Sequence, residues 1–371
     1  MGFKCGIVGL PNVGKSTLCN ALSGTVAAEV ANYPFCTIEP NVSRVIVPDT
    51  RLETLAKIAK SAKTIPTYLD IADIAGLVKG ASKGEGLGNK FLTHIREVDA
   101  IMHVVRCFDT DDITHVENTI DPVRDIDLIE TELVLADLES LDKRLQNFNS
   151  KNKFKKDKHI LLEKELMEKC LTILNRGEKV IDNLNEIGLE HDSNELQQLQ
   201  LLTAKPYFYV CNIAEDEVGK EENSYCKAVK ILAKKHSVSV IVISAKIEEE
   251  ISKLQDEEEK KFFLESMNLT EAGLNKVIRC GHDILDLQTF FTVGPKEARA
   301  WSIKKGTTAP KAAGCIHTDF EKGFIRAEVI SFENYVQYNG ETGSKEAGKM
   351  SAEGKEYIMQ DADVVHFRFN V

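Results

Sequence analysis

Residues 9–17 read GLPNVGKST and directly follow an apolar segment, Phe3–Val8. The stretch fits GxxxxGK[ST], and Leu18–Leu22 continues it as a predicted helix. A strand, a glycine-rich loop and a helix in this order bind phosphate, because backbone N–H groups of the loop and the helix N-terminus point at the anion. We expect Lys15 to neutralise the β- and γ-phosphates and Ser16 to hold Mg²⁺. The expected phosphate-binding residues are Asn12, Val13, Gly14, Lys15, Ser16 and Thr17.

The composition is that of a soluble globular protein. The chain has 371 residues, with 47 Lys+Arg against 58 Asp+Glu and a net charge of −11. At roughly 100–200 residues per domain, this length predicts two or three domains. The net negative charge argues against nucleic-acid binding over the whole protein surface, but it is compatible with a local basic patch. The 9 cysteines include no CxxC pair, and no long apolar segment occurs, so we expect a reduced, cytoplasmic protein with no membrane association.

Short apolar segments alternate with helical stretches up to about residue 110 and again after residue 202. This alternation predicts an α/β P-loop core with a mostly parallel six-stranded sheet. We expect a discontinuous nucleotide-binding domain over residues 1–125 and 203–285. The expected strands are Phe3–Val8, Val42–Val47, Tyr68–Ile71, Ala100–Val105, Tyr207–Cys211 and Val238–Ile243.

Residues 126–202 form an insertion with a different pattern. Two sets of apolar residues repeat at spacings of 4 and 3, which predicts two antiparallel helices in a coiled-coil arm, with a kink at Gly177. The sets are Val134, Leu138, Leu141 and Leu145, then Leu166, Cys170, Ile173, Gly177, Val180, Leu184 and Ile187. The tip, residues 147–159, is rich in lysine. It is either a solvated loop or a finger that contacts phosphates, and we favour the finger. Its lysines are Lys151, Lys153, Lys155, Lys156 and Lys158.

The C-terminal region, residues 286–371, predicts a compact α+β module. Its expected strands are Phe290–Val293, Phe324–Ile330 and Val364–Phe369, with one short helix near Thr308–Gly314. Its charge is nearly balanced, so by itself it is no obvious nucleic-acid binder.

Two further motifs suit a nucleotide switch. Residues 73–76 read DIAG at the end of a predicted strand, so Asp73 can hold Mg²⁺ through water and the Gly76 N–H can sense a γ-phosphate. Thr37, within NYPFCTIEPN at residues 32–41, is the candidate second Mg²⁺ ligand. Cys36 lies beside it, which raises the hypothesis that oxidation blocks the loop.

The base site departs from a guanine-specific pattern. Asn212-Ile213-Ala214-Glu215 stands where guanine-binding proteins have NKxD, and Ser244-Ala245-Lys246 follows the last strand. Ile213 removes the lysine and Glu215 is one methylene longer than Asp, so the acceptors for guanine are out of register. We predict weak guanine preference with adenine accepted. The expected base-site residues are Asn212, Ile213, Glu215, Ser244, Ala245 and Lys246.

These motifs resemble the YchF/Obg-like ATPase family. GLPNVGKST, NYPFCTIEPN, DIAGLVKGASKGEGLGNKF, SAKIEEEI and IHTDFEKGFIRAEVI all fit it, and the resemblance covers essentially the whole chain. It implies ATP hydrolysis in preference to GTP, Mg²⁺ on Ser16 and Thr37, and Ile213 at the base. It also implies a TGS-type (β-grasp) C-terminal module and association with the ribosome, through its large subunit or RNA, in translation or stress regulation. We expect a monomer.

The hydrolytic residue is less defined. Leu77 stands where many GTPases carry the glutamine that orients water, so we expect slow turnover. His94 and His115 are candidate replacements, and we favour His115, whose acidic neighbours and loop position would let it reach the site. The catalytic candidates are therefore Lys15, Gly76 and His115. Alternatives are an Obg-class GTPase with relaxed base specificity, a metabolic P-loop kinase, and a scaffold with structural nucleotide.

Overall fold

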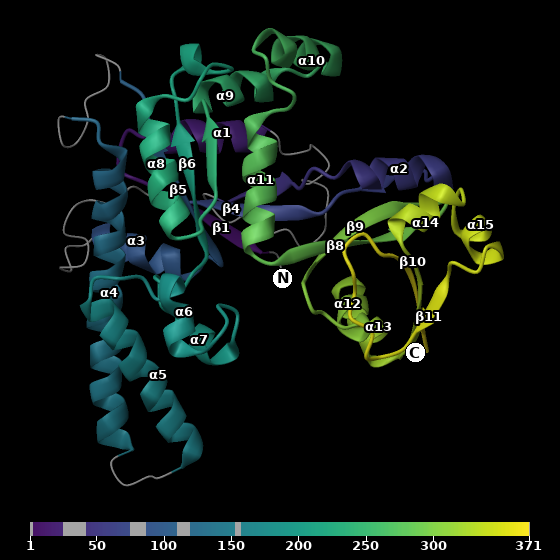
Figure 1. The fold of residues 1–371 in the computed structure, drawn as a ribbon. Helices are drawn as coiled ribbons and strands as arrows, with labels where there is room; N and C mark the ends of the chain where they lie inside the picture. The colour runs from purple at the N-terminus through teal and green to yellow at the C-terminus, as the bar shows by residue number, and fades with distance from the viewer. Residues whose placement is uncertain (1–2, 25–41, 75–86, 110–118, 153–156, 371) are drawn as a thin grey trace. The chain divides into compact units, whose positions relative to one another are not determined.

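The computed structural model describes residues 3–24, 42–74, 87–109, 119–152 and 157–370. The chain divides into two compact units (Figure 1). The first comprises Met1–Arg44 with Asp70–Val277, and the second comprises Val45–Leu69 with Ile278–Val371. No helix in these ranges combines the length and the apolar character that crossing a bilayer requires.

The first unit is built on a six-stranded sheet in the order β2-β4-β1-β5-β6-β7. Its strands are β1 (Lys4–Val8), β2 (Val42–Ile46), β4 (Tyr68–Asp73), β5 (Ala100–Arg106), β6 (Tyr207–Asn212) and β7 (Val240–Ile243). The β1 pairings with β4 and β5 are parallel, as are β5–β6 and β6–β7. All six expected strands are present, which confirms the predicted sheet.

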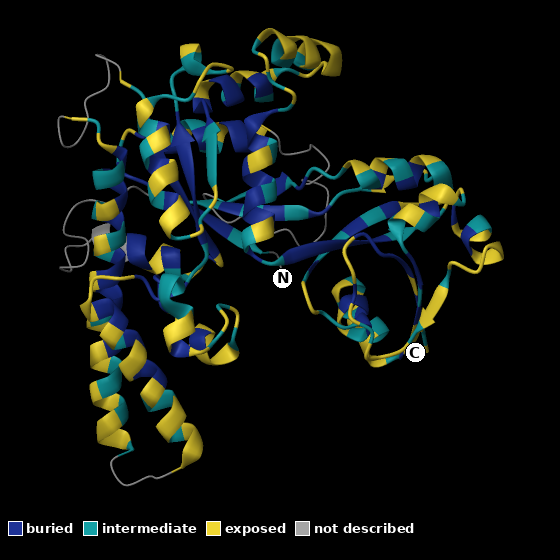
Figure 2. Ribbon diagram, viewed as in Figure 1, coloured by how far each residue is buried: buried dark blue, intermediate teal, exposed yellow. Residues whose placement is uncertain are grey.

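Helices cover this sheet, so β5 and β6 are buried along their whole lengths (Figure 2). The helix α4 packs against α8 and β5, and α8 packs on β6 and β7. The helices associated with this unit are α1 (Lys15–Gly24), α3 (Leu87–Arg96), α4 (Pro122–Lys151), α5 (Lys158–Asn175), α6 (Leu184–Ile187), α7 (Asn194–Leu199), α8 (Ser224–Lys235), α9 (Ala245–Lys253), α10 (Glu257–Ser266) and α11 (Gly273–Ile284), with 3-10 turns η3 (Ile181–Asn183) and η4 (Glu215–Glu217).

The insertion is a pair of packed helices, α4 and α5 (Figure 1). The Asp121 carboxylate caps α4 by accepting from Val123 N and Arg124 N, which fixes where this helix begins. The expectation of one continuous second helix with a kink at Gly177 is wrong. The helix α5 ends at Asn175 because Gly177 takes a left-handed φ of 77°.

The apolar spacing beyond Gly177 nevertheless marks core positions. Val180 and Ile187 are buried in the same cluster as the α4 and α5 residues, although they lie around η3 and α6. Short segments that fold back on the pair bury these side chains as well as a long helix would. The periodicity therefore predicted burial correctly and the helix length incorrectly.

The second unit contains another six-stranded sheet, in the order β11-β10-β12-β8-β9-β3. Its strands are β3 (Thr64–Ile65), β8 (Leu287–Val293), β9 (Ala298–Lys304), β10 (Phe324–Ile330), β11 (Ser351–Glu353) and β12 (Val364–Phe369). Its helices are α2 (Thr50–Ala59), α12 (Ala309–Ile316), α13 (Thr318–Lys322), α14 (Phe332–Gln337) and α15 (Glu341–Glu346). The expected α+β module is therefore present, with β9 and β11 in addition to the expected strands.

The two compact units divide the chain differently from the expected domains at two places. Residues 45–69, assigned from sequence to the nucleotide-binding domain, group with residues 278–371. The reason is the apolar face of α2, where Leu52, Leu55 and Ala56 pack in one cluster with Phe291 and Ala300. The C-terminal unit also begins within α11 rather than at residue 286.

Candidate functional site

Lys15 lies buried at the first position of α1, directly after the glycine-rich loop. Its ammonium donates to the carbonyl oxygens of Gly9, at 3.0 Å, and Leu10, at 2.6 Å. Burial lowers the pKa of Lys15 to about 8, against opposing contributions from Asp73 and Cys19. A desolvated cation is thus held over its own loop by neutral oxygens, and a phosphate group would be a stronger partner for it.

The loop backbone takes a conformation that few residues adopt. Asn12 has a φ of 63° and Gly14 a φ of 99°, and Leu18 N donates to Gly14 O to begin the helical hydrogen bonds of α1. Ser16, next to Lys15, is exposed and can present its hydroxyl to a metal ion. Val13 is buried and Thr17 is partly buried. The predicted loop residues therefore form one strand-loop-helix turn with the geometry of an anion site.

Asn212, at the end of β6, is buried and uses its whole side chain to join two loops. Its Nδ2 donates to Val13 O at 2.9 Å, and its Oδ1 accepts from Ala245 N at 2.9 Å. The sequence predicted a nucleotide contact for Asn212. The structure shows that this amide holds the phosphate loop against the start of α9, so its contribution to the site is to position both loops.

Glu215 lies shortly after β6 and Lys246 lies next to Ala245, and their side chains form an ion pair. The glutamate begins η4 and the lysine lies in the first turn of α9. Both are partly exposed, and the pairing raises the pKa of Lys246. Ile213 N donates to Ile243 O at 2.8 Å, which ties this loop to β7. Ile213 is partly buried, whereas Ser244 and Ala245 are buried.

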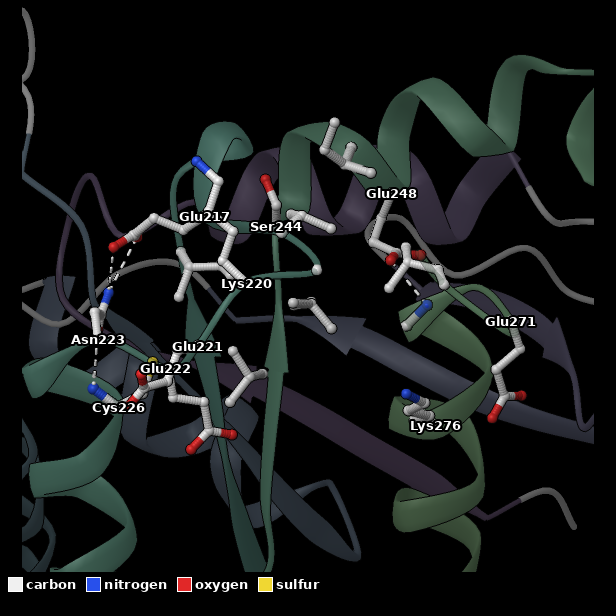
Figure 3. A pocket seen from close by; sticks show the side chains of 18 residues that line it. Glu217, Lys220, Glu221, Glu222, Asn223, Cys226, Ser244, Glu248, Glu271 and Lys276 are labelled. Atoms are coloured by element: carbon white, nitrogen blue, oxygen red, sulfur yellow. Dashed lines mark hydrogen bonds between the residues drawn. The ribbon is translucent and has the colours of Figure 1, made fainter. Parts of the chain in front are cut away.

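A pocket of about 170 Å³ lies beside these elements. Ile213 and Ser244 contribute to its wall, together with Glu217, Asn223 and Lys276 (Figure 3). Asn223 donates from Nδ2 to both carboxylate oxygens of Glu217, at 2.9 and 3.0 Å. The pocket is therefore polar on one side and apolar where Ile213 and Ile243 line it.

Asp73 ends β4, as the strand-end motif predicted. Burial, together with the charge of Asp73 and a hydrogen bond to its side chain, raises the pKa of Cys19 to about 12. Asp73 also contributes a favourable interaction to the ammonium of Lys15. One carboxylate is thus placed near the first helix of the phosphate loop, in agreement with an indirect role beside a metal ion. Cys19 is a neighbour that sequence reasoning missed, since a lone cysteine in a helix carries no signal.

Several predicted residues lie outside the described residues. They are Thr37, Gly76 and His115, with Cys36 and three of the tip lysines, Lys153, Lys155 and Lys156. Of the remaining tip lysines, Lys151 is the last residue of α4 and Lys158 is the first of α5, and both are exposed. His94, the second histidine candidate, is exposed on α3.

The parallel sheet, the phosphate loop and the loops that follow β6 and β7 define a P-loop nucleotide-binding protein of the GTPase class. A family model described as 50S ribosome-binding GTPase matches residues 4–162. A second, for the C-terminal domain of YchF GTPases and described as a protein of unknown function, matches residues 287–370.

Relatives that match over their full length identify the family within this class. The chain is 55% identical to the ribosome-binding ATPase YchF of Haemophilus influenzae and 50% identical to that of Bacillus subtilis, over 100% of each chain. The solved structure of the Schizosaccharomyces pombe YchF GTPase is 37% identical, with a TM-score of 0.87 over 99% of this chain and 98% of that one. The chain belongs to the YchF family.

Proposed function

We propose that the protein is a Mg²⁺-dependent ATPase that prefers ATP to GTP and acts as a nucleotide switch on the ribosome. The names of its relatives support ATP hydrolysis and ribosome binding. The ion pair between Glu215 and Lys246 carries the proposal on base preference. We further propose a cytoplasmic monomer that acts in translation or stress regulation.

Guanine presents two adjacent donors, N1–H and N2–H₂, and needs an acceptor that is free to take both. The Oε1 atom of Glu215 already accepts from the Lys246 ammonium, so the two guanine donors would compete with that ammonium for the same carboxylate. Adenine presents an acceptor at N1 beside a donor at N6, which suits a site that offers one donor and one acceptor. Ile213 offers an uncharged, apolar side chain, which could contact either base.

The phosphate loop fits Mg²⁺ and a triphosphate. Lys15 would move its ammonium from Gly9 O and Leu10 O to the β- and γ-phosphate oxygens, where charged oxygens replace neutral carbonyl oxygens as its acceptors. Ser16 and Thr37 would ligate Mg²⁺, and Asp73 would reach it through water. The ion would neutralise charge on the phosphates. Gly76 N–H would sense the γ-phosphate and His115 would orient water. With Leu77 at the usual glutamine position, turnover is slow.

Calorimetric titration with ATP and GTP tests the base preference. The double variant Ile213→Lys with Glu215→Asp restores the guanine-binding pattern and should shift the ratio of the ATP and GTP dissociation constants toward GTP by at least about tenfold. Asp216→Asn, an exposed change in the same turn, should leave the ratio unchanged. Equal affinities for ATP and GTP in the unmodified protein would refute the proposed preference and favour a GTPase with relaxed specificity.

Product analysis separates hydrolysis from phosphoryl transfer. Labelled ATP, incubated with the purified protein and a protein-free metabolite extract, should yield inorganic phosphate as the only labelled product, as expected for a switch. Transfer of label to a small molecule would favour the kinase alternative. If Lys15→Ala changed thermal stability and nothing else, nucleotide would be structural and the scaffold alternative would hold.

Co-sedimentation with ribosomes tests the partner. The ATP and ADP forms should differ in ribosome affinity, because a switch requires that nucleotide and partner binding be coupled. Replacing Lys151, Lys153, Lys155, Lys156 and Lys158 by glutamine should weaken binding and flatten its salt dependence. Glutamine at the exposed Lys253 and Lys261 is the matched control. Equal sedimentation of both nucleotide forms across a salt series would contradict the switch.

A further inference from the structure

Three cysteine side chains meet inside the first unit, from parts of the chain that are far apart in sequence. Cys107 follows β5, Cys211 lies in β6, and Cys226 lies in the first turn of α8. Their sulfur atoms all lie within 4.8 Å of one another, and all three residues are buried. Among the described residues, each of the three ligand atoms that this group offers a metal ion is a cysteine sulfur.

The backbone around the three sulfurs is cross-linked by hydrogen bonds. Cys107 N donates to Asn212 O at 2.8 Å, beside the parallel pairing of Val105 with Cys211. Asn223, the N-cap of α8, donates from Nδ2 to Cys107 O at 2.7 Å and accepts from Cys226 N at 2.9 Å. These bonds fix the three Cβ positions before any ligand arrives, so little ordering entropy opposes binding.

The sulfurs also interact with one another. Hydrogen bonds with Cys107 and Cys211 lower the pKa of Cys226, and the same contacts raise the pKa of Cys107. Although the hydrogen bond with Cys107 and the charge of Lys230, on α8, act in the opposite direction, the pKa of Cys211 is raised by its hydrogen bond to Cys226 and by burial. A thiolate at Cys226 would also lie in the first turn of a helix, where negative charge is stabilised.

The cluster borders the pocket that lies beside the loops after β6 and β7. Cys226 lines the 170 Å³ pocket, next to Asn223 and the carboxylates of Glu217 and Glu222 (Figure 3). Because Cys226 is fully buried, a cation drawn by these carboxylates would reach its sulfur from the pocket only after a local movement of side chains.

We propose that Cys107, Cys211 and Cys226 form a three-coordinate site for a soft, thiophilic cation, with Cu(I) as the ion that fits best. Thiolates select soft cations, and zinc in structural sites takes four ligands, whereas the group offers three. Three sulfurs about 2.3 Å from a central ion lie about 4 Å apart, so the cluster needs to contract by less than about 1 Å. Binding forms three Cu–S bonds and breaks the S–H bond of each sulfur that is still protonated. One proton leaves to the solvent for each S–H bond broken, and no atom changes its oxidation state.

The test is a Cu(I) titration of the reduced full chain without oxygen, in competition with the chelator bicinchoninate. Exposed Cys315 and Cys36, which lies outside the described residues, are replaced by serine in every protein so that neither thiol competes for copper. We expect one Cu(I) per chain, with a first coordination shell of sulfur by X-ray absorption. Cys226→Ala and Cys211→Ala should each weaken binding by more than about tenfold.

Cys170→Ala is the matched control, because Cys170 is fully buried but lies in the α4–α5 cluster. Its Cu(I) affinity should equal that of the background protein. Thermal unfolding establishes that each variant is folded. The proposal is overturned if the background protein binds no Cu(I) against the chelator, if its bound copper has a nitrogen or oxygen ligand in place of one of the three sulfurs, or if Cys170→Ala loses as much affinity as Cys226→Ala.

Discussion

A Cβ atom on Gly14 would lie 2.2 Å from the Nδ2 atom of Asn212. The two residues are almost 200 positions apart in the chain, yet the amide that joins the phosphate loop to α9 leaves no room for a side chain at Gly14. Glycine at this position is therefore required twice, by the φ of 99° and by the contact with Asn212.

Gly14→Ala should reduce ATP affinity by more than about tenfold, because the loop must shift away from Asn212 or lose its bond to it. Calorimetry with ATP measures this effect. Asn212→Ala should also weaken binding, since Val13 O and Ala245 N lose their partners. The double variant should lose less than the sum of the two single losses, because both changes disturb one contact. Strict additivity would show that Gly14 and Asn212 act independently.

Lys15→Met should stabilise the nucleotide-free protein at pH 7 while abolishing ATP binding. Burial lowers the pKa of Lys15 from 10.5 to about 8, so below pH 8 the folded state carries a desolvation cost of up to about 3 kcal/mol. Between pH 8 and 10.5 the unfolded state binds the extra proton. The stability of the unmodified protein therefore rises with pH relative to the variant, and the gain from methionine shrinks.

Urea unfolding of the unmodified protein and of Lys15→Met from pH 7 to pH 10 measures the difference between their free energies of unfolding. The contributions of the other titrating groups are the same in both proteins and cancel in this difference. Lys57→Met, on an exposed position of α2, is the control and should show no such trend. A stability difference that stays constant across this range would contradict the assignment of the cost to the buried ammonium.

Asp137→Ala should lower the free energy of unfolding by about 3 kcal/mol. This buried carboxylate of α4 accepts from Leu202 N at 3.0 Å, from Thr203 N at 2.8 Å and from Thr203 Oγ1 at 2.7 Å. Its removal leaves buried donors without an acceptor. Hydrogen exchange should accelerate at residues 202 and 203, whereas Asp142→Ala, at an exposed position of the same helix, should change neither quantity.

Gly177→Ala should lower the free energy of unfolding by about 1 kcal/mol, because of backbone strain alone. The φ of 77° disfavours a Cβ, although nothing lies within 4 Å of where that atom would be. Gly354 has equally empty space around its Cβ position but no positive φ. Gly354→Ala should therefore change the free energy of unfolding in urea by no more than about 0.5 kcal/mol. A loss at Gly177 no larger than that at Gly354 would mean that the helix end does not depend on glycine.

The sequence predicted features whose physical cause is local. A phosphate loop needs glycine, lysine and serine at fixed spacings beside a strand, so residues 9–17 identified both the loop and the start of the sheet. Strands buried on both faces are continuous apolar segments, and β5 and β6 were found for that reason. The strand β9 was missed because its residues, ARAWSIK, mix small, charged and large apolar side chains and form no continuous apolar segment.

Features that depend on distant contacts could not be predicted in this way. Nothing in residues 45–69 indicates that α2 packs against Phe291. The role of Asn212 as a bond between two loops requires knowing where Val13 and Ala245 lie. In the cysteine cluster, Cys107 lies about a hundred residues before Cys211, and Cys226 lies fifteen residues after it. No metal-binding sequence pattern has these spacings.

The border between the two units falls inside β2, β4 and α11, not in a linker. Cutting the chain at residue 286 would therefore not yield a complete nucleotide-binding half. The remaining fragment would keep α2 but lose Phe291, Ala298 and Ala300, and it would expose Leu52 and Leu55 to water. We expect such a fragment to aggregate, and limited proteolysis of the intact protein should not release a stable C-terminal piece on its own.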